Sequence, residues 1–534
     1  MTKIGEGAFS NCPALRSIKL PANLESIEKE TFKSCDALES IDIPETVTKI
    51  GEEAFSNCQT LKSIDIPDKT KDIGERAFLA CTDLTNITIG DGMTNIGKEA
   101  FLYTSLQSVT IKSAQTIGEY AFFGCSNLSD VIIGTVKNIG ESAFSGCTNL
   151  PSLNIEGTEN IGDKAFKNCT SLASITLPQT ITGIGTSAFG SSGLTSITIP
   201  GSVKQLSDDT FNKCTALKTA TLEEGVETIG NNAFTGCEEL ISINIASTVT
   251  SIGRYAFNIC PKLATVTFAG AAPQLNSLGQ GAFQSCEALT SINIPDNVTT
   301  LATGTFNGCS KLASVKLPKH LESIGQYAFQ QCVELAELDI PESVTKIDNN
   351  TFNMCTKLAT VAFSGQTPLL NSIGANAFYK CVHLANITLP DKLETIGQSA
   401  FYGCTNLISV RIPDNVTQIA AKTFQNCDRL VTVVLPKNLT SIGDYAFNAC
   451  GVLANFVYTG STLPTPTVST TAYSAIYKLK YLFLPNYTST LTGPSLTWAG
   501  KTWKNIHYNA NTGTDLSTID ALTNTGNYQN HITQ

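Results

Sequence analysis

The chain has 534 residues, of which only 15% are charged, and its net charge at pH 7 is −10. It contains neither a basic cluster nor a stripe of interleaved basic and aromatic residues, which argues against nucleic acid as a partner. No apolar run reaches the roughly eighteen residues of a membrane span, and no signal-peptide pattern opens the chain.

A repeat of about 23 residues organises the chain. The sequence around each copy approximates V-x-x-I-G-x-x-A-F-x-x-C-x-x-L-x-S-I-x-I-P, and residues 47–67 show it in full. Twenty marker phenylalanines set the period: Phe9, Phe32, Phe55, Phe78, Phe101, Phe122, Phe144, Phe166, Phe189, Phe211, Phe234, Phe257, Phe283, Phe306, Phe329, Phe352, Phe378, Phe401, Phe424 and Phe447.

Each repeat predicts one coil of a solenoid. The run Ser63-Ile64-Asp65-Ile66 alternates polar and β-branched residues, which predicts a strand with one buried face, and Pro67 ends it. Gly51 predicts a corner, and the run between it and the cysteine predicts a helical turn that packs the phenylalanine inward. Because 23 residues cannot hold a strand and a full crossover helix, we expect a narrow solenoid with in-register parallel strands.

The recurring L-x-x-I-x-I run, with A-F-x-x-C upstream, resembles the BspA-like class of leucine-rich repeats over residues 1 to roughly 508. The resemblance implies a right-handed curved array of about 21 coils, with one long parallel β-sheet and short β or 3-10 return segments. It also implies extracellular or cell-surface display and adhesion to host or microbial components. The array begins inside a coil at MTKIGEGAF, so we expect a leader or an upstream segment to be missing from this chain.

The 18 cysteines each follow a marker phenylalanine by three residues, and only the coils of Phe101 and Phe189 lack one. This ladder predicts buried, reduced thiols that pack as small apolar groups. Disulfides between adjacent coils are the alternative, because the Cα spacing would allow them, although parallel side-chain directions disfavour pairing. We expect no zinc site, because no C-x-x-C run occurs and the four histidines are scattered.

The outward strand position, ten residues after most markers, is neutral and polar in the middle of the array. Hydroxyl and amide side chains suit any exposed sheet face, so a purely structural role is one interpretation. The other is a flat surface that binds a protein or a glycan. The candidate ligand-binding residues are Thr176, Thr198, Thr221, Asn244, Thr267 and Asn293.

Three marker steps are 26 residues long, and they recur every 95 residues. The extra residues begin at Phe268, Phe363 and Tyr458, and each insertion contains glycine and proline. We expect three loops at one edge, produced by duplication of a four-coil unit. They are either functionless or, as loops on a rigid scaffold often are, binding elements.

The C-terminal region departs from the repeat. Tyr473 takes the marker position of a twenty-first coil, which completes a predicted solenoid over residues 1–485. Residues 486–508, with Trp498 and Trp503, predict a cap over the core end, or else an aromatic ligand platform. The outward row becomes apolar at Val434, Val457 and Phe483, either as a contact site or as a surface beneath the cap. Residues 509–534 predict a flexible polar tail or linker.

No phosphate loop, H-E-x-x-H run or nucleophile elbow occurs, so we predict neither enzymatic activity nor a cofactor. Acidic residues such as Glu52, Glu53 and Glu75 cluster just before the markers and predict a solvated outer face rather than paired catalytic carboxylates. We therefore predict an extracellular binding or adhesion scaffold for a protein or glycan ligand. A structural spacer is the main alternative, and an intracellular scaffold is a further one.

Overall fold

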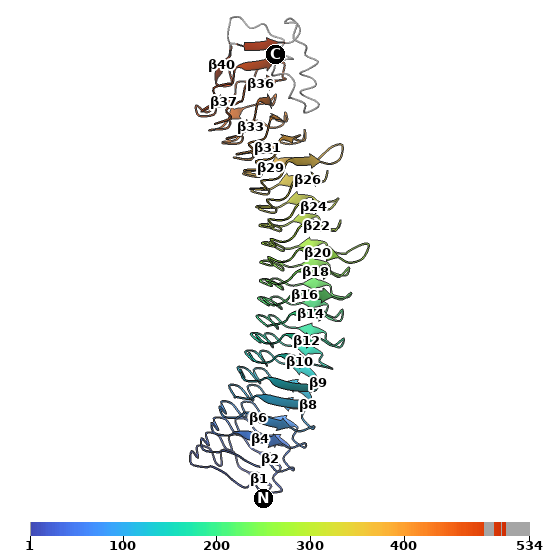
Figure 1. Ribbon diagram of the computed structural model, residues 1–534, viewed down its shortest axis with the longest axis vertical. Coiled ribbons are helices and arrows are strands. Elements are labelled where there is room, and N and C mark those ends of the chain that lie inside the picture. Colours follow the sequence, from blue (N-terminus) through green and yellow to red (C-terminus); the bar gives the residue numbers. More distant parts are fainter. Residues whose placement is uncertain (1, 485–495, 504, 509–534) are drawn as a thin grey trace. The chain divides into compact units, whose positions relative to one another are not determined.

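The structure is a computed structural model that describes residues 2–484, 496–503 and 505–508. The chain divides into two compact units, Met1–Gln274 and Leu275–Gln534. Within each unit the coils stack one on another, and all regular elements of the described residues are β-strands (Figure 1). The predicted repeat solenoid of about 21 coils is confirmed.

Most coils of unit 1 contribute a main strand after the leucine and a two-residue short strand before the marker phenylalanine. The main strands are β4 (Ser63–Ile66), β6 (Asn86–Ile89), β8 (Ser108–Ile117), β9 (Asp130–Ile139), β10 (Ser152–Asn154), β12 (Ser174–Thr176), β14 (Ser196–Ile199), β16 (Thr219–Leu222), β18 (Ser242–Ile245) and β20 (Thr265–Phe268). The short strands are β1 (Lys3–Ile4), β2 (Ser26–Ile27), β3 (Lys49–Ile50), β5 (Asp72–Ile73), β7 (Asn95–Ile96), β11 (Asn160–Ile161), β13 (Gly183–Ile184), β15 (Gln205–Leu206), β17 (Thr228–Ile229) and β19 (Ser251–Ile252).

Unit 2 repeats this scheme and adds a hairpin. Its main strands are β22 (Ser291–Asn293), β24 (Ser314–Lys316), β26 (Glu337–Ile340), β28 (Thr360–Phe363), β30 (Asn386–Ile387), β32 (Ser409–Arg411), β34 (Thr432–Leu435), β36 (Asn455–Tyr458) and β38 (Tyr481–Leu484). The short strands are β21 (Ser277–Leu278), β23 (Thr300–Leu301), β25 (Ser323–Ile324), β27 (Lys346–Ile347), β29 (Ser372–Ile373), β31 (Thr395–Ile396), β33 (Gln418–Ile419), β35 (Ser441–Ile442) and β37 (Thr467–Val468). The antiparallel hairpin consists of β39 (Leu496–Trp498) and β40 (Lys501–Trp503), and β41 (Asn505–Tyr508) pairs in parallel with β38.

The strands of successive coils pair in parallel and in register, so equivalent residues of neighbouring coils face each other. The expected single sheet is divided in each unit into shorter ladders. In unit 1, for example, β10–β12 forms one ladder, and β14, β16, β18 and β20 form another. The ten-residue strands β8 and β9 pair with each other and run through both the main-strand and the short-strand positions of their coils. β8 also pairs with the main strand β6 and the short strand β7, so the two ladders join at this point.

The core is a set of columns that the repeat places inside each coil. In the coil of Phe55, the side chains of Val47, Phe55, Cys58 and Leu61 are fully buried. Rings of neighbouring markers stack, with centroids 5.3 Å apart between Phe32 and Phe55. Because each ring packs against its equivalent in the next coil, the core continues from coil to coil within each unit.

The return segment is a run of turns rather than the expected 3-10 helical turn. Residues two before and two after most markers have left-handed φ angles, for example Glu53 (51°) and Asn57 (60°). The N–H groups of Glu53, Phe55 and Asn57 all donate to carbonyls of the next coil, at 2.8 Å. The alternate N–H groups, those of Ala54, Ser56 and Cys58, donate to the carbonyl three residues back. The segment is therefore a series of single turns that are bonded to the next coil, rather than a continuous helical turn.

The corner four residues before the marker is built in two ways, which differ in the residue at the corner and in the residue just before the marker. Where glycine stands there, as at Gly74, a Cβ atom would lie 2.5 Å from the backbone of Gly51, and alanine precedes the phenylalanine. Where a larger residue stands there, as at Ser207, threonine precedes the phenylalanine, and Thr210 Oγ1 donates to the Ser207 carbonyl at 2.7 Å. Threonine fills this place in the coils of Phe32, Phe211, Phe306, Phe352 and Phe424, and the last coil, with Ser469 and Ala472, is the exception.

Candidate ligand-binding face

The predicted ligand-binding residues lie on the outward face of the main strands. Thr176, Thr198, Thr221, Asn244 and Thr267 belong to unit 1, and Asn293 belongs to unit 2. All six are exposed, while the residues that alternate with them are buried. Proline or a polar turn follows most of these strands, which fixes the length of the face.

Four of these residues share one ladder. Thr198 is in register with Thr221, Thr221 with Asn244, and Asn244 with Thr267. Neighbours in such a row are about 4.8 Å apart along the stack. Thr267 Oγ1 donates to Asn244 Oδ1 at 2.8 Å. Thr176 lies on the separate β10–β12 ladder, in register with Asn154.

The row from Thr198 to Thr267 is uncharged, whereas in unit 2 the charged Lys316 is in register with Asn293. In unit 1, carboxylates stand at the ends of the strands. Glu223 accepts a hydrogen bond from Gln179 Nε2 at 3.0 Å, which spans two coils. Glu224 accepts from the backbone N–H and the hydroxyl of Ser247, and these bonds lower the pKa of the Glu224 carboxyl. The centre of the face therefore offers hydroxyl and amide groups, and a carboxylate border lies at one edge.

Two shallow hollows on the main-strand side were not singled out by sequence. One, of about 430 Å³ in unit 1, is lined by Asp42, Asp65, Asp68, Thr88 and Lys112 among others. Lys112 pairs with Asp91 at 2.7 Å. The other, of about 340 Å³ in unit 2, includes Glu337 and Asp339. Asp42, Asp65 and Asp339 occupy the outward strand position, ten residues after their markers, but an alternating strand pattern does not show curvature of the surface.

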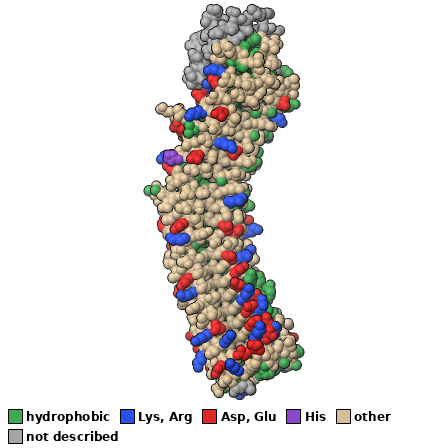
Figure 2. All heavy atoms as spheres, turned by 180° about the vertical axis from the view of Figure 1, so that it is seen from behind, with side chains coloured by type: hydrophobic (Ala, Val, Ile, Leu, Met, Phe, Trp, Pro, Cys, Tyr) green, Lys and Arg blue, Asp and Glu red, His purple; other side chains and the backbone are tan. Residues whose placement is uncertain are grey.

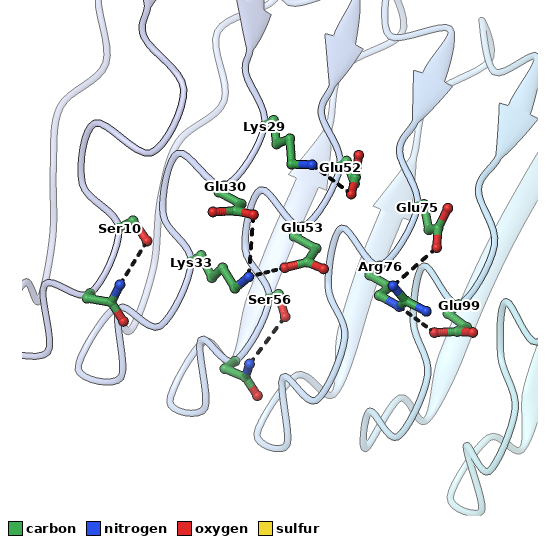
Figure 3. A network of polar contacts seen from close by, with 12 residues as sticks. Ser10, Lys29, Glu30, Lys33, Glu52, Glu53, Ser56, Glu75, Arg76 and Glu99 are labelled. Carbon is green, nitrogen blue, oxygen red and sulfur yellow. Dashed lines mark hydrogen bonds and ion pairs between the residues drawn. The ribbon is translucent and has the colours of Figure 1, made fainter.

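Acidic residues before the markers form ion pairs between coils of unit 1, as Figure 3 shows. Lys29 pairs with Glu52 at 3.0 Å, Lys33 with Glu53, and Arg76 with Glu99 at 2.6 Å. Positive and negative side chains intermix over the N-terminal coils (Figure 2). Lys33 also pairs with Glu30, and Arg76 with Glu75, so each of these cations lies between two acids. The Glu52 side chain is exposed as predicted, whereas those of Glu53 and Glu99 are largely covered.

The cysteines belong to the core, and all 18 are thiols rather than members of disulfides. All but Cys12 are buried. Thiols contact the marker carbonyl of the preceding coil, as Cys58 Sγ does with Phe32 at 3.1 Å. In the two coils without cysteine, the hydroxyls of Thr104 and Ser192 take its place and lie 3.3 Å from Cys125 Sγ and Cys214 Sγ.

The C-terminal apolar row is buried at Val434 and Val457, and Phe483 packs against them. Trp503 is also buried, and its indole donates to the Trp498 carbonyl at 2.9 Å. Its ring contacts Phe456, with centroids 5.8 Å apart. Residues 486–495 and 504 of the predicted cap and all of the predicted tail lie outside the described residues.

The family model for BspA type leucine rich repeat regions matches six times, over residues 2–129, 111–218, 137–264, 183–302, 276–369 and 371–494. The chain belongs to the BspA-type leucine-rich repeat family. No curated protein matches its sequence.

The chain also resembles several solved structures. A leucine-rich repeat protein of Bacteroides ovatus is 29% identical, with a TM-score of 0.55, over 62% of this chain and 88% of that one. A leucine rich cell surface protein of Faecalibacterium prausnitzii is also 29% identical, with a TM-score of 0.37, over 61% and 92%. The pneumococcal vaccine antigen PcpA is 18% identical, with a TM-score of 0.33, over 66% and 92%. The first of these supports the fold found here.

The described residues contain no helix that is long and apolar enough to cross a membrane. Over the same part of the chain, no three His, Cys, Asp or Glu side chains come together in a way that could hold a metal ion.

Proposed function

We propose that the chain is a non-catalytic binding scaffold, displayed outside the cell, that holds a protein or glycan ligand against its main-strand face. The observation that carries this proposal is the exposed, uncharged row of Thr198, Thr221, Asn244 and Thr267 in unit 1. Hydroxyl and amide groups donate and accept hydrogen bonds without the cost of desolvating a charge. The regular spacing suits an extended ligand that repeats its own polar groups.

Burial beneath the row supports a rigid presentation. Ile197, Ala220, Ile243 and Val266 lie under the same strands and are at most 6% exposed. The backbone that carries the outward side chains is therefore fixed by packing, so little backbone entropy is lost when a ligand binds. Membership of a repeat family whose coils form continuous surfaces is consistent with this role.

The test is a binding array of glycans and matrix proteins, followed by variants of the row. The double variant Thr198→Lys, Thr221→Lys places two charges in the neutral face. It is expected to lower the affinity for the ligand at least about tenfold. Thr186→Lys is the matched control, because Thr186 is exposed but precedes the marker Phe189. Unchanged binding by the double variant would reject the main-strand face as the site. Protease treatment of intact cells, which removes surface proteins only, tests the location.

A spacer is the second candidate, and the unbroken stack of marker rings from Phe9 to Phe257 in unit 1 favours it. A spacer needs length and stiffness but no particular outward residues. Two results together would support the spacer over the binding scaffold. The chain would bind none of the arrayed ligands, and deletion of four coils would abolish display of a neighbouring domain.

A further inference from the structure

The three long loops occupy equivalent positions in their coils, but they differ in the contacts that hold and cover them. Each begins at an aromatic residue where other main strands have an aliphatic one, at Phe268, Phe363 and Tyr458. In the first two loops, the sixth residue after the aromatic donates its N–H to the preceding coil, from Gln274 to Ser247 and from Leu369 to Glu342, both at 2.9 Å.

The third loop, in unit 2, lacks that donor because Pro464 stands at the sixth position. The Tyr458 hydroxyl lies between the loop and the preceding coil instead, 2.6 Å from the carbonyl of Thr462 and 3.0 Å from that of Lys437, the equivalent of Glu342. Trp498 then covers the site. Its ring centroid is 5.1 Å from that of Tyr458, and its indole N–H donates to the Pro464 carbonyl at 2.7 Å. Tyr458 is thereby left only 2% exposed.

The second loop has the same base without a covering ring. Phe363 is half-buried, Leu369 is 40% exposed, and no aromatic ring from the described residues contacts Phe363. The two ends of this loop are bonded to residues of the preceding coil that are two positions apart. The backbone N–H of Ser364 donates to the carbonyl of Ile340, and that of Leu369 donates to the carbonyl of Glu342. This places Phe363 and Leu369 together at the base of the loop, which projects from its coil in Figure 1.

The loop is also held in place and surrounded by negative charge. Glu342 Oε1 accepts from the backbone N–H and the hydroxyl of Thr367, at 3.2 and 2.8 Å. Glu337 and Asp339, on the preceding main strand, are exposed. None of these three carboxylates forms an ion pair with another described residue. A fixed apolar base beside unpaired acids is complementary to an aromatic side chain that is flanked by a base.

We propose that Phe363 and Leu369 form a docking site for a tryptophan side chain, flanked by a basic residue, of a partner polypeptide. The chain supplies such an occupant to its own third loop, since β39–β40 carries Trp498 three residues before Lys501. The proposed site belongs to the loop rather than to the strand face, and it is independent of the ligand proposed for that face.

The probe is a cyclised peptide with the sequence of residues 496–503, Leu-Thr-Trp-Ala-Gly-Lys-Thr-Trp, titrated into the full chain by fluorescence anisotropy. Phe363→Ile restores the aliphatic residue found at Ile340, and Leu369→Ser changes an exposed side chain, so both variants keep the fold. Each is expected to weaken binding about tenfold, and Glu342→Gln to reduce its salt dependence. Ile241→Ser is the control, because Ile241 is also an exposed apolar residue but lies in unit 1, away from the loop.

Two outcomes would overturn the proposal. The first is equal binding of the peptide by the wild type and by both loop variants, which would place the peptide elsewhere. The second is equal binding when both tryptophans of the peptide are leucine, which would make the contact generally apolar rather than aromatic. Thermal unfolding of each variant confirms that lost binding is not lost structure.

Discussion

The thiol of Cys58 donates a hydrogen bond to the carbonyl oxygen of Phe32, one coil earlier, at 3.1 Å. The same carbonyl accepts the backbone N–H of Cys35 at 3.3 Å. The Cys58 thiol therefore gives this buried acceptor of the preceding coil a second donor, as well as filling space. A purely apolar side chain of similar size would fill the space alone.

The first prediction concerns Cys58→Ser and Cys58→Ala. Serine keeps a hydroxyl donor for the Phe32 carbonyl. Alanine removes both the donor and the packed sulfur. We expect alanine to lower the free energy of unfolding by about 1–3 kcal/mol, and serine by less. Urea unfolding followed by circular dichroism measures both, and equal losses would show that the hydrogen bond is unimportant.

The second prediction concerns thiol reactivity. Burial raises the pKa of the Cys58 thiol to about 12 and that of Cys125 to about 11, so neither forms the reactive thiolate at neutral pH. Cys12 alone is partly accessible. Titration with a thiol reagent is expected to modify no more than one cysteine in the folded chain and all 18 in denaturant. Rapid modification of many thiols without denaturant would contradict this arrangement.

The third prediction is loss of stability in alkali. Because burial raises the folded-state pKa of thiols such as Cys58 and Cys214, the folded chain holds protons that the unfolded chain releases. This stabilisation is complete below the unfolded pKa near 9 and declines as the pH rises toward 11 to 12. In that window, each such thiol lowers the free energy of unfolding by about 1.4 kcal/mol for every unit by which the pH rises. Melting temperatures should therefore fall steeply above pH 9, and less steeply in a variant with several of these cysteines changed to serine.

The fourth prediction compares two glycines at the same corner. Gly74→Ala would place Cβ 2.5 Å from the Gly51 backbone, whereas nothing lies within 4 Å of a Cβ at Gly5. We expect Gly74→Ala to cost about 2 kcal/mol or more, because the coils would have to separate, and Gly5→Ala to be nearly neutral. Chemical denaturation separates the two, and a similar cost for both would mean that the chain relaxes easily at this corner.

Prediction from sequence worked where one residue type has one physical role. Phe55 and Cys58 recur at a fixed phase and are apolar, so their burial followed from the pattern. It failed in the return segment, because left-handed positions hold Glu53 and Asn57 rather than glycine, and their sequence does not mark the turn. It also could not connect Trp498 to Tyr458, which lie forty residues apart and meet only through the hairpin. The ligand-binding residues remain a prediction, although their exposure is now established.

In-register stacking has a consequence for how such genes change. The backbone N–H of Phe55 donates to the carbonyl of Ala77, and equivalent bonds join neighbouring coils within each unit, so the coils present similar upper and lower surfaces. Recombination between two copies of the 95-residue unit would insert or remove four coils and still join matching surfaces. The gene for this chain could therefore change its length by whole blocks of four coils without breaking the pattern of bonds between coils.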